Sequence, residues 1–103
     1  MAMTAEQIAA KAAELVSGER DRQHGNMHAN FASIAEAVNG ILPAIGIITS
    51  RPLTSHDVAV LMCGVKIGRM MNGKFNVDDY VDLAGYAACA GEIAGLNAGG
   101  QDA

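Results

Sequence analysis

The chain has 103 residues and a net charge of −4, with half of its residues hydrophobic and 4% aromatic. This length fits one small domain, and its limited core favours assembly with further copies. The acidic balance and the absence of tryptophan exclude a basic nucleic-acid surface and a platform for stacked bases. We therefore expect no nucleic-acid partner and predict a homo-oligomer.

The placement of the cysteines and the hydropathy pattern indicate the cellular compartment of the protein. Cys63 and Cys89 lie in apolar stretches and lack the spacing of metal ligands, so we expect reduced, buried thiols. The first residues hold neither a basic segment nor a long apolar one, and no stretch reaches the roughly 18 apolar residues of a membrane span. These features predict a cytoplasmic protein with no membrane partner.

Helix signals begin near the start of the chain. Thr4 with Gln7 three residues later has the form of a capping box, and apolar residues then recur at helical spacing. This pattern predicts a helix over about residues 5–17. After a polar stretch interrupted by Gly25, a second apolar periodicity predicts a helix over about residues 27–41.

A loop over residues 42–53 is the least regular part of the chain. Pro43 and Pro52 bracket it, and β-branched residues within 45–49 favour one short extended piece. A single such piece cannot form a sheet, so the predicted fold class is all-α.

Two more helices follow the loop. Thr54 with Asp57 forms a second cap signal, and the apolar series after it predicts a helix over about residues 55–71. Asn76 caps a fourth helix, whose first turn is acidic as the helix dipole favours.

Small residues are unusually frequent in the last two helices, with Gly64 and Gly68 in one and Gly85 in the other. A glycine inside a helix costs about 1 kcal/mol relative to alanine, so a close helix contact is expected to compensate. We predict tight helix pairing, within the chain or across a symmetric interface. The helices belong to one domain over residues 4–96, and a flexible tail is expected over 97–103.

Charged residues interrupt these two apolar helices. Lys66 and Arg69 stand among apolar residues of the third helix, where an unpaired buried charge would cost several kcal/mol. Asp78 and Asp82 lie four residues apart on one face of the fourth helix. Two interpretations stay open: an internal ion-pair network between the helices, or a site where the cations meet the phosphate of a small molecule.

Metal and nucleophilic chemistry have little support in the sequence. His24 and His28 have the spacing of helical metal ligands, but Gly25 lies between them and no third ligand follows. Neither a nucleophile elbow nor a phosphate loop occurs. We predict no metal, no cofactor and no catalytic residue; Mg²⁺ would be needed only by a hydrolase, whose carboxylate set is incomplete here.

Four sequence elements together resemble a known family. They are Arg22-Gln23-His24-Gly25, Asn30-Phe31 with Ile34-Ala35, Asp57-Val58-Ala59 with Met62, Lys66 and Arg69, and Asp78 with Asp82, Gly85 and Tyr86. In this order they resemble an uncharacterised family of short all-α proteins encoded mainly by bacteriophages and prophages. They are also distantly similar to the MazG-type nucleotide pyrophosphatases. The resemblance implies an all-α, four-helix, MazG-like bundle completed by oligomerisation. It also implies a nucleotide-like ligand and, for a phage protein, the host cytoplasm.

Two departures from the MazG-type pattern favour ligand recognition without turnover. His24 stands where those proteins usually have tyrosine, and the Glu-Glu-x-x-Glu element of their magnesium site is missing. We predict a protein that binds, and in a phage could sequester, a phosphorylated nucleotide or nucleotide-derived signal. A MazG-like metal-dependent pyrophosphohydrolase and a structural helical adaptor without ligand remain as alternatives.

The predicted ligand site draws on most of the chain. Lys66 and Arg69 are expected to bind phosphate, and either Tyr86 or Phe31 is expected to pack on a base. The aspartates would orient these cations, or bind ribose hydroxyls or a metal. The full set of ligand-binding candidates is Lys66, Arg69, Asp78, Asp82, Tyr86, His24, Asn30, Phe31 and Arg51.

Overall fold

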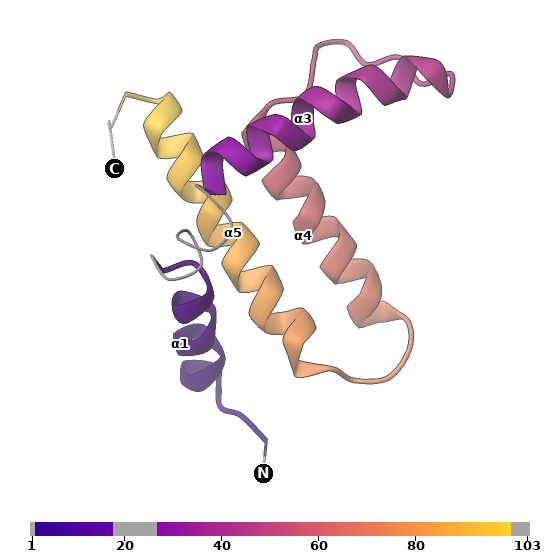
Figure 1. The fold of residues 1–103 in the computed structure, drawn as a ribbon. Coiled ribbons are helices and arrows are strands. Elements are labelled where there is room, and N and C mark those ends of the chain that lie inside the picture. Colours follow the sequence, from indigo (N-terminus) through magenta and orange to yellow (C-terminus); the bar gives the residue numbers. More distant parts are fainter. Residues whose placement is uncertain (1, 18–26, 100–103) are drawn as a thin grey trace.

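The computed structural model of the protein describes residues 2–17 and 27–99. Within them lie the helices α1 (Ala5–Leu15), α3 (Met27–Ala44), α4 (Ser55–Met71) and α5 (Val77–Asn97) (Figure 1). No strand occurs in these residues, so the predicted all-α class with four helices is confirmed. None of the described helices combines the length and the apolar character that crossing a membrane requires.

Side-chain caps fix where the helices begin. Thr4 and Gln7 form the expected capping box of α1, and Thr54 and Asp57 form that of α4. The side chain of Asn76 accepts a hydrogen bond from a first-turn N–H of α5. These local signals are strong because each satisfies backbone N–H groups that have no partner inside the helix.

The helices form an open arrangement around a hairpin (Figure 1). α4 and α5 run antiparallel and pack along their length, while α3 crosses one end of this pair and projects beyond α4. α1 lies along the side of α5 that faces away from α4. The radius of gyration of 15.2 Å exceeds the roughly 13 Å of a compact domain of this length.

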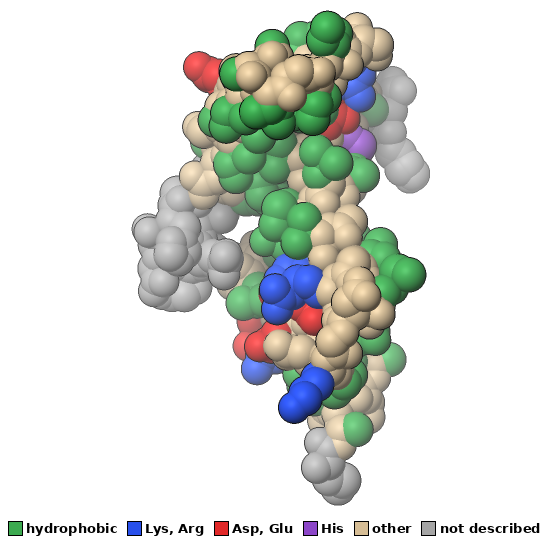
Figure 2. All heavy atoms as spheres, turned by 90° about the vertical axis from the view of Figure 1, so that its right-hand side faces the viewer, with side chains coloured by type: hydrophobic (Ala, Val, Ile, Leu, Met, Phe, Trp, Pro, Cys, Tyr) green, Lys and Arg blue, Asp and Glu red, His purple; other side chains and the backbone are tan. Residues whose placement is uncertain are grey.

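A small core holds these helices together. Its buried residues are Phe31, Ala35, Val58, Ala59, Cys89, Ala90 and Ile93, from α3, α4 and α5. α1 contributes only Ala12 to the buried residues. Many large hydrophobic side chains stay exposed instead, and Figure 2 shows hydrophobic side chains on the face that α3 and α4 turn outward.

The end of α3 differs from the prediction, because the helix continues through Pro43 to Ala44 instead of ending near residue 41. Gly46, with φ of +85°, ends it: Gly46 N–H donates to Pro43 O and Ile47 N–H donates to Leu42 O, the pair of bonds of a Schellman motif. These bonds turn the chain, so the extended piece expected over residues 45–49 does not form.

The glycines of α4 do not mediate the contact with α5. A Cβ atom added to Gly64 or Gly68 would meet nothing within 4 Å, and the same holds for Gly91 in α5. Among the glycines within residues 2–17 and 27–99, only Gly85 approaches another element, with Val16 Cγ1 3.5 Å from its added Cβ. The glycine surface of α4 is therefore turned away from the rest of the described chain.

Candidate functional site

Two ion pairs cross the contact between α4 and α5. Lys66 Nζ lies 3.0 Å from Asp82 Oδ2, and Arg69 Nε lies 2.9 Å from Asp79 Oδ1. The Asp79 side chain is 6% exposed, whereas that of Arg69 is 58% exposed, so the pair joins a buried carboxylate to a guanidinium that reaches solvent. Both cations thus have acidic partners, as one of the two interpretations of the sequence required.

The sequence predicts that Asp78 and Asp82 form the acidic face of the fourth helix that meets the cations. In the structure the partner of Arg69 is Asp79 and not Asp78. In an antiparallel helix pair, moving three residues along one helix moves the contact three residues back along the other. Lys66 meets Asp82, and Arg69 therefore meets Asp79. Asp78 is exposed, and its backbone N–H donates to Asn76 Oδ1 at 3.0 Å.

A cavity of about 580 Å³ lies between α1, α3 and α5. It is lined by Leu15, Val16, Met27, Asn30, Phe31, Ser33, Ile34, Asp82, Gly85, Tyr86 and Cys89. The rings of Phe31 and Tyr86 lie in its wall with centroids 6.1 Å apart and planes tilted by 44°. Asp82 therefore contacts both the cavity and, through its Oδ2, Lys66.

A row of functional groups follows one face of α5, and two of its residues, Asp82 and Tyr86, line the cavity. Tyr86, Asp82 and Asp79 follow at spacings of four and three residues, so they span about 10.5 Å along the helix. Asp82 adds the ammonium of Lys66 to this row, and Asp79 adds the guanidinium of Arg69. The row thus runs from an aromatic ring in the cavity to an exposed cation.

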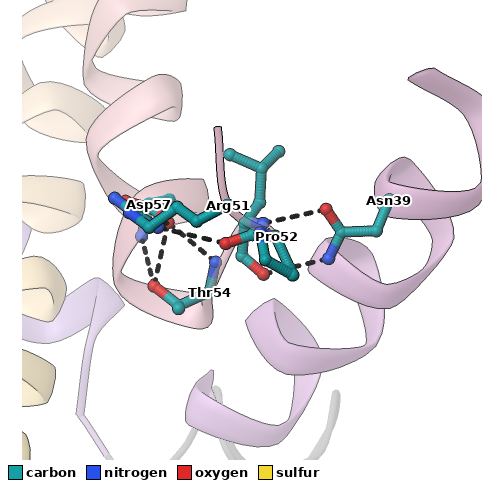
Figure 3. A network of polar contacts seen from close by, with 6 residues as sticks. Asn39, Arg51, Pro52, Thr54 and Asp57 are labelled. Atoms are coloured by element: carbon teal, nitrogen blue, oxygen red, sulfur yellow. Dashed lines mark hydrogen bonds and ion pairs between the residues drawn. The ribbon is translucent and has the colours of Figure 1, made fainter. Parts of the chain in front are cut away.

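Arg51 lies at the other end of α4 and serves the loop before that helix (Figure 3). Its Nη2 donates to Asp57 Oδ1 at 2.9 Å, and Thr54 N–H donates to Asp57 Oδ2 at 2.8 Å. These bonds hold the pKa of the Asp57 carboxyl well below its usual range. Arg51 is therefore not brought together with Lys66 and Arg69.

Asn39 fixes the same loop to α3 (Figure 3). Its Oδ1 accepts from Leu53 N–H at 2.8 Å, and its Nδ2 donates to Leu53 O at 3.0 Å. One side chain thereby satisfies both backbone polar groups of a residue that belongs to no helix.

The other predicted residues divide into two groups. Asn30, Phe31 and Tyr86 line the cavity, whereas His24 lies outside the described residues. Within residues 2–17 and 27–99, no group of three or more His, Cys, Asp or Glu side chains is placed to hold a metal. Sequence reasoning missed Asp79 and Ser33; the register of the antiparallel pair would have found Asp79, whereas nothing in the sequence singles out Ser33.

Fold and site together define a small all-α protein with an ion-paired helix hairpin beside a cavity. The chain belongs to the family described as a domain of unknown function (DUF6378), which matches residues 7–94. It is 34% identical over 88 residues to the Gene 55 protein of Mycobacterium phage D29, covering 85% of this chain and 54% of that protein. It is 32% identical over 80 residues to the Gene 55 protein of Mycobacterium phage L5, covering 78% of this chain and 47% of that protein.

The chain thus spans about half the length of the curated relatives that it matches. No solved structure matches it significantly. The expected resemblance to an uncharacterised family with phage members is confirmed at that level.

Proposed function

We propose that the protein binds a phosphorylated nucleotide or a nucleotide-derived small molecule in the cavity and along the face of α5 beside it. The observation that carries this proposal is the row on α5 from Tyr86 through Asp82 to Asp79, whose carboxylate holds Arg69. Its length of about 10.5 Å is close to that of an extended nucleoside monophosphate, with a base at one end and a phosphate at the other. Sequestration of such a molecule is the biological role we propose.

The cavity supports the base-binding half of this proposal. Its volume of about 580 Å³ falls within the roughly 300–1,000 Å³ of small-molecule sites. Its wall is mostly apolar, with the Phe31 and Tyr86 rings available for a flat base and Ser33 for a polar edge. Asp82 is one-third exposed and is suited to accept hydrogen bonds from ribose hydroxyls.

The ion pairs support the phosphate-binding half. Arg69 Nε donates to Asp79 Oδ1 in the ion pair. The outer nitrogens of a guanidinium carry further donors that can bind phosphate. Lys66 has three ammonium donors and contacts Asp82 through its Nζ. In this proposal the aspartates hold the cations in place and the phosphate binds beside them.

The same pairs favour a second candidate, a structural helical adaptor in which Lys66 and Arg69 serve only to join α4 to α5. The ion pairs already neutralise both cations, so no anion is required to balance them. We also propose that the protein assembles with further copies into a MazG-like bundle. This assembly could serve either nucleotide binding or nucleotide hydrolysis.

Ligand-dependent thermal unfolding tests the proposal. We expect at least one nucleoside mono-, di- or triphosphate to raise the Tm of the wild type, and isothermal titration calorimetry to give a saturable heat. Tyr86→Leu should abolish this rise because it removes a ring from the cavity wall. Tyr80→Leu is the matched control: Tyr80 lies on the same helix but packs against Phe75, away from the cavity.

Each alternative predicts a different result. If no nucleotide raises the wild-type Tm, the adaptor is favoured and the binding proposal fails. Release of pyrophosphate from a nucleoside triphosphate with Mg²⁺, lost in Asp82→Asn, would favour the hydrolase. Equal binding by the Tyr86→Leu and Tyr80→Leu variants would place the ligand outside the cavity.

A further inference from the structure

The outer face of α4 is apolar, although nothing in the described chain covers it. Val60, Leu61 and Met71 are 48%, 55% and 78% exposed, and they share this face with Gly64 and Gly68 at helical spacing. The opposite face carries the buried Val58 and Ala59. The glycines, which meet nothing within 4 Å, form a shallow saddle in the middle of the outer face.

Each end of this face carries further exposed hydrophobic side chains. The connection before α4 holds Ile45, Ile47 and Ile48, which are 63%, 48% and 90% exposed; we call these three residues the isoleucine arm. The turn after α4 holds Phe75, which is 79% exposed. Figure 2 shows hydrophobic side chains at one end of this side of the molecule and along its edge.

We propose that this face binds a second copy of the chain, with the two α4 helices antiparallel about a twofold axis between Gly64 and Gly68. Gly64 of each copy then lies opposite Gly68 of the other, and Leu61 lies opposite Met71. The glycine saddle lets the two backbones approach closely, as glycine surfaces on paired helices do. The interface is isologous, so the same contacts occur twice.

The residues at the two ends of the outer face of α4 favour the antiparallel orientation. It brings the isoleucine arm of one copy onto the Met71 end of the other, so that both groups are covered together. It also places Asp57, at the N-terminal end of α4, near Lys74, which follows the C-terminal end. A parallel pair would also bring the two saddles together, but it would place Asp57 near Asp57 and Lys74 near Lys74.

The available area is sufficient for a stable dimer. The exposed hydrophobic residues concerned are Ile45, Ile47, Ile48, Val60, Leu61, Ile67, Met71 and Phe75. At roughly 100 Å² apiece they offer about 800 Å² per copy, which equals the usual contribution of one partner to a standard interface. The single chain is open and has a small core, so it buries little apolar surface by itself and can bury more by association through this face.

This inference gives the proposed oligomer a surface and an orientation, and it does not depend on ligand binding. The cavity lies between α1, α3 and α5, whereas the interface lies on the outer face of α4. If the protein dimerises but binds no nucleotide, the interface proposal holds and the ligand-site proposal fails. If the protein is monomeric and binds a nucleotide, the ligand-site proposal holds and the interface proposal fails.

Disulfide trapping tests both the contact and its orientation. We expect the double variant Leu61→Cys, Met71→Cys to give a covalent dimer on mild oxidation, because each new thiol faces the other new thiol of the second copy. Ten residues of helix separate the two positions by about 15 Å, so they cannot bridge within one chain, where disulfides need Cα atoms within about 7 Å. The single variants, which keep Cys63 and Cys89, control for native thiols.

Light scattering with a glycine variant provides the second measurement. We expect a dimer at micromolar concentration and at least roughly tenfold weaker association in Gly64→Leu, because the larger side chain overfills the saddle. Gly95→Leu is the matched control, since Gly95 is also helical and also open around its Cβ. Circular dichroism should show both variants folded.

Three results would overturn the proposal. A wild type that stays monomeric at tens of micromolar would assign the face to a different partner. Single cysteine variants that cross-link as well as the double variant, under conditions where the wild type with its native thiols does not, would indicate a parallel pair. Association unchanged in Gly64→Leu would place the contact elsewhere.

Discussion

Removing Arg69 should expose how much the buried Asp79 carboxylate depends on it. In Arg69→Ala the carboxylate, 6% exposed, keeps its place in the first turn of α5 but loses the guanidinium 2.9 Å away. Breaking a fully buried pair from one side costs about 3–5 kcal/mol, whereas an exposed pair contributes about 0–1 kcal/mol. The Arg69–Asp79 pair lies between these limits, because one partner is buried and the other is more than half exposed.

We therefore expect Arg69→Ala to lower the free energy of unfolding by about 2 kcal/mol. The N-terminal end of α5 continues to stabilise the negative charge by about 0.5 kcal/mol, which keeps the loss below that of a fully buried pair. For a 60–100-residue domain, each kcal/mol corresponds to about 4–8 °C, so the expected fall in Tm is about 8–16 °C. The measurement is urea and thermal unfolding without ligand.

Two companion variants make this expectation refutable. Arg69→Ala with Asp79→Asn should recover most of the lost stability, because a neutral amide costs far less to bury than an unpaired carboxylate. Lys74→Ala removes the same charge from an exposed turn and should change stability by less than about 0.5 kcal/mol. If Arg69→Ala matches Lys74→Ala, or if Asp79→Asn gives no recovery, the pair does not stabilise the hairpin.

The loop before α4 yields two more predictions. The folded-state pKa of Asp57 lies below its ordinary value of 3.8, so its stabilisation is complete above about pH 4 and is lost as the pH falls through the folded-state value. The stability gap between wild type and Asp57→Asn should therefore be constant near neutral pH and shrink below about pH 4 in urea unfolding; a gap independent of pH would contradict this. Asn39→Ala should lower the free energy of unfolding by about 1–2 kcal/mol in the same assay, because the backbone N–H and C=O of Leu53 lose the Asn39 amide. The control Asn72→Ala removes one exposed hydrogen bond to Gly68 O and should lower it by less than about 0.5 kcal/mol.

The helices were predictable because their signals are local. Thr4 and Thr54 each show the cap residue and its partner three positions later, and this geometry needs no tertiary contact to form. The end of α3 was missed because Pro43 was taken to limit the helix. In the structure the helix runs through Pro43, which removes one backbone hydrogen bond, and the chain turns at Gly46, where glycine adopts a positive φ without a steric penalty.

The site was predictable only in part, because it depends on how two helices align. The sequence indicated that Lys66 and Arg69 need acidic partners or an anionic ligand, and Asp82 is the acidic partner of Lys66. Spacing alone could not choose between Asp78 and Asp79, since both lie within a turn of Asp82. The antiparallel register decides it, and that register is set by packing of α4 on α5 rather than by any local pattern.

The shallow seating of α1 has a consequence for the dynamics of the protein. α1 buries only Ala12 and packs chiefly on α5, so its detachment exposes little apolar surface and needs far less free energy than global unfolding. Leu15 and Val16 leave with it, and they form one wall of the cavity. Partial opening of the fold at α1 would thus widen the entrance to the cavity, and a bound molecule would slow hydrogen exchange of the α1 amides before any others.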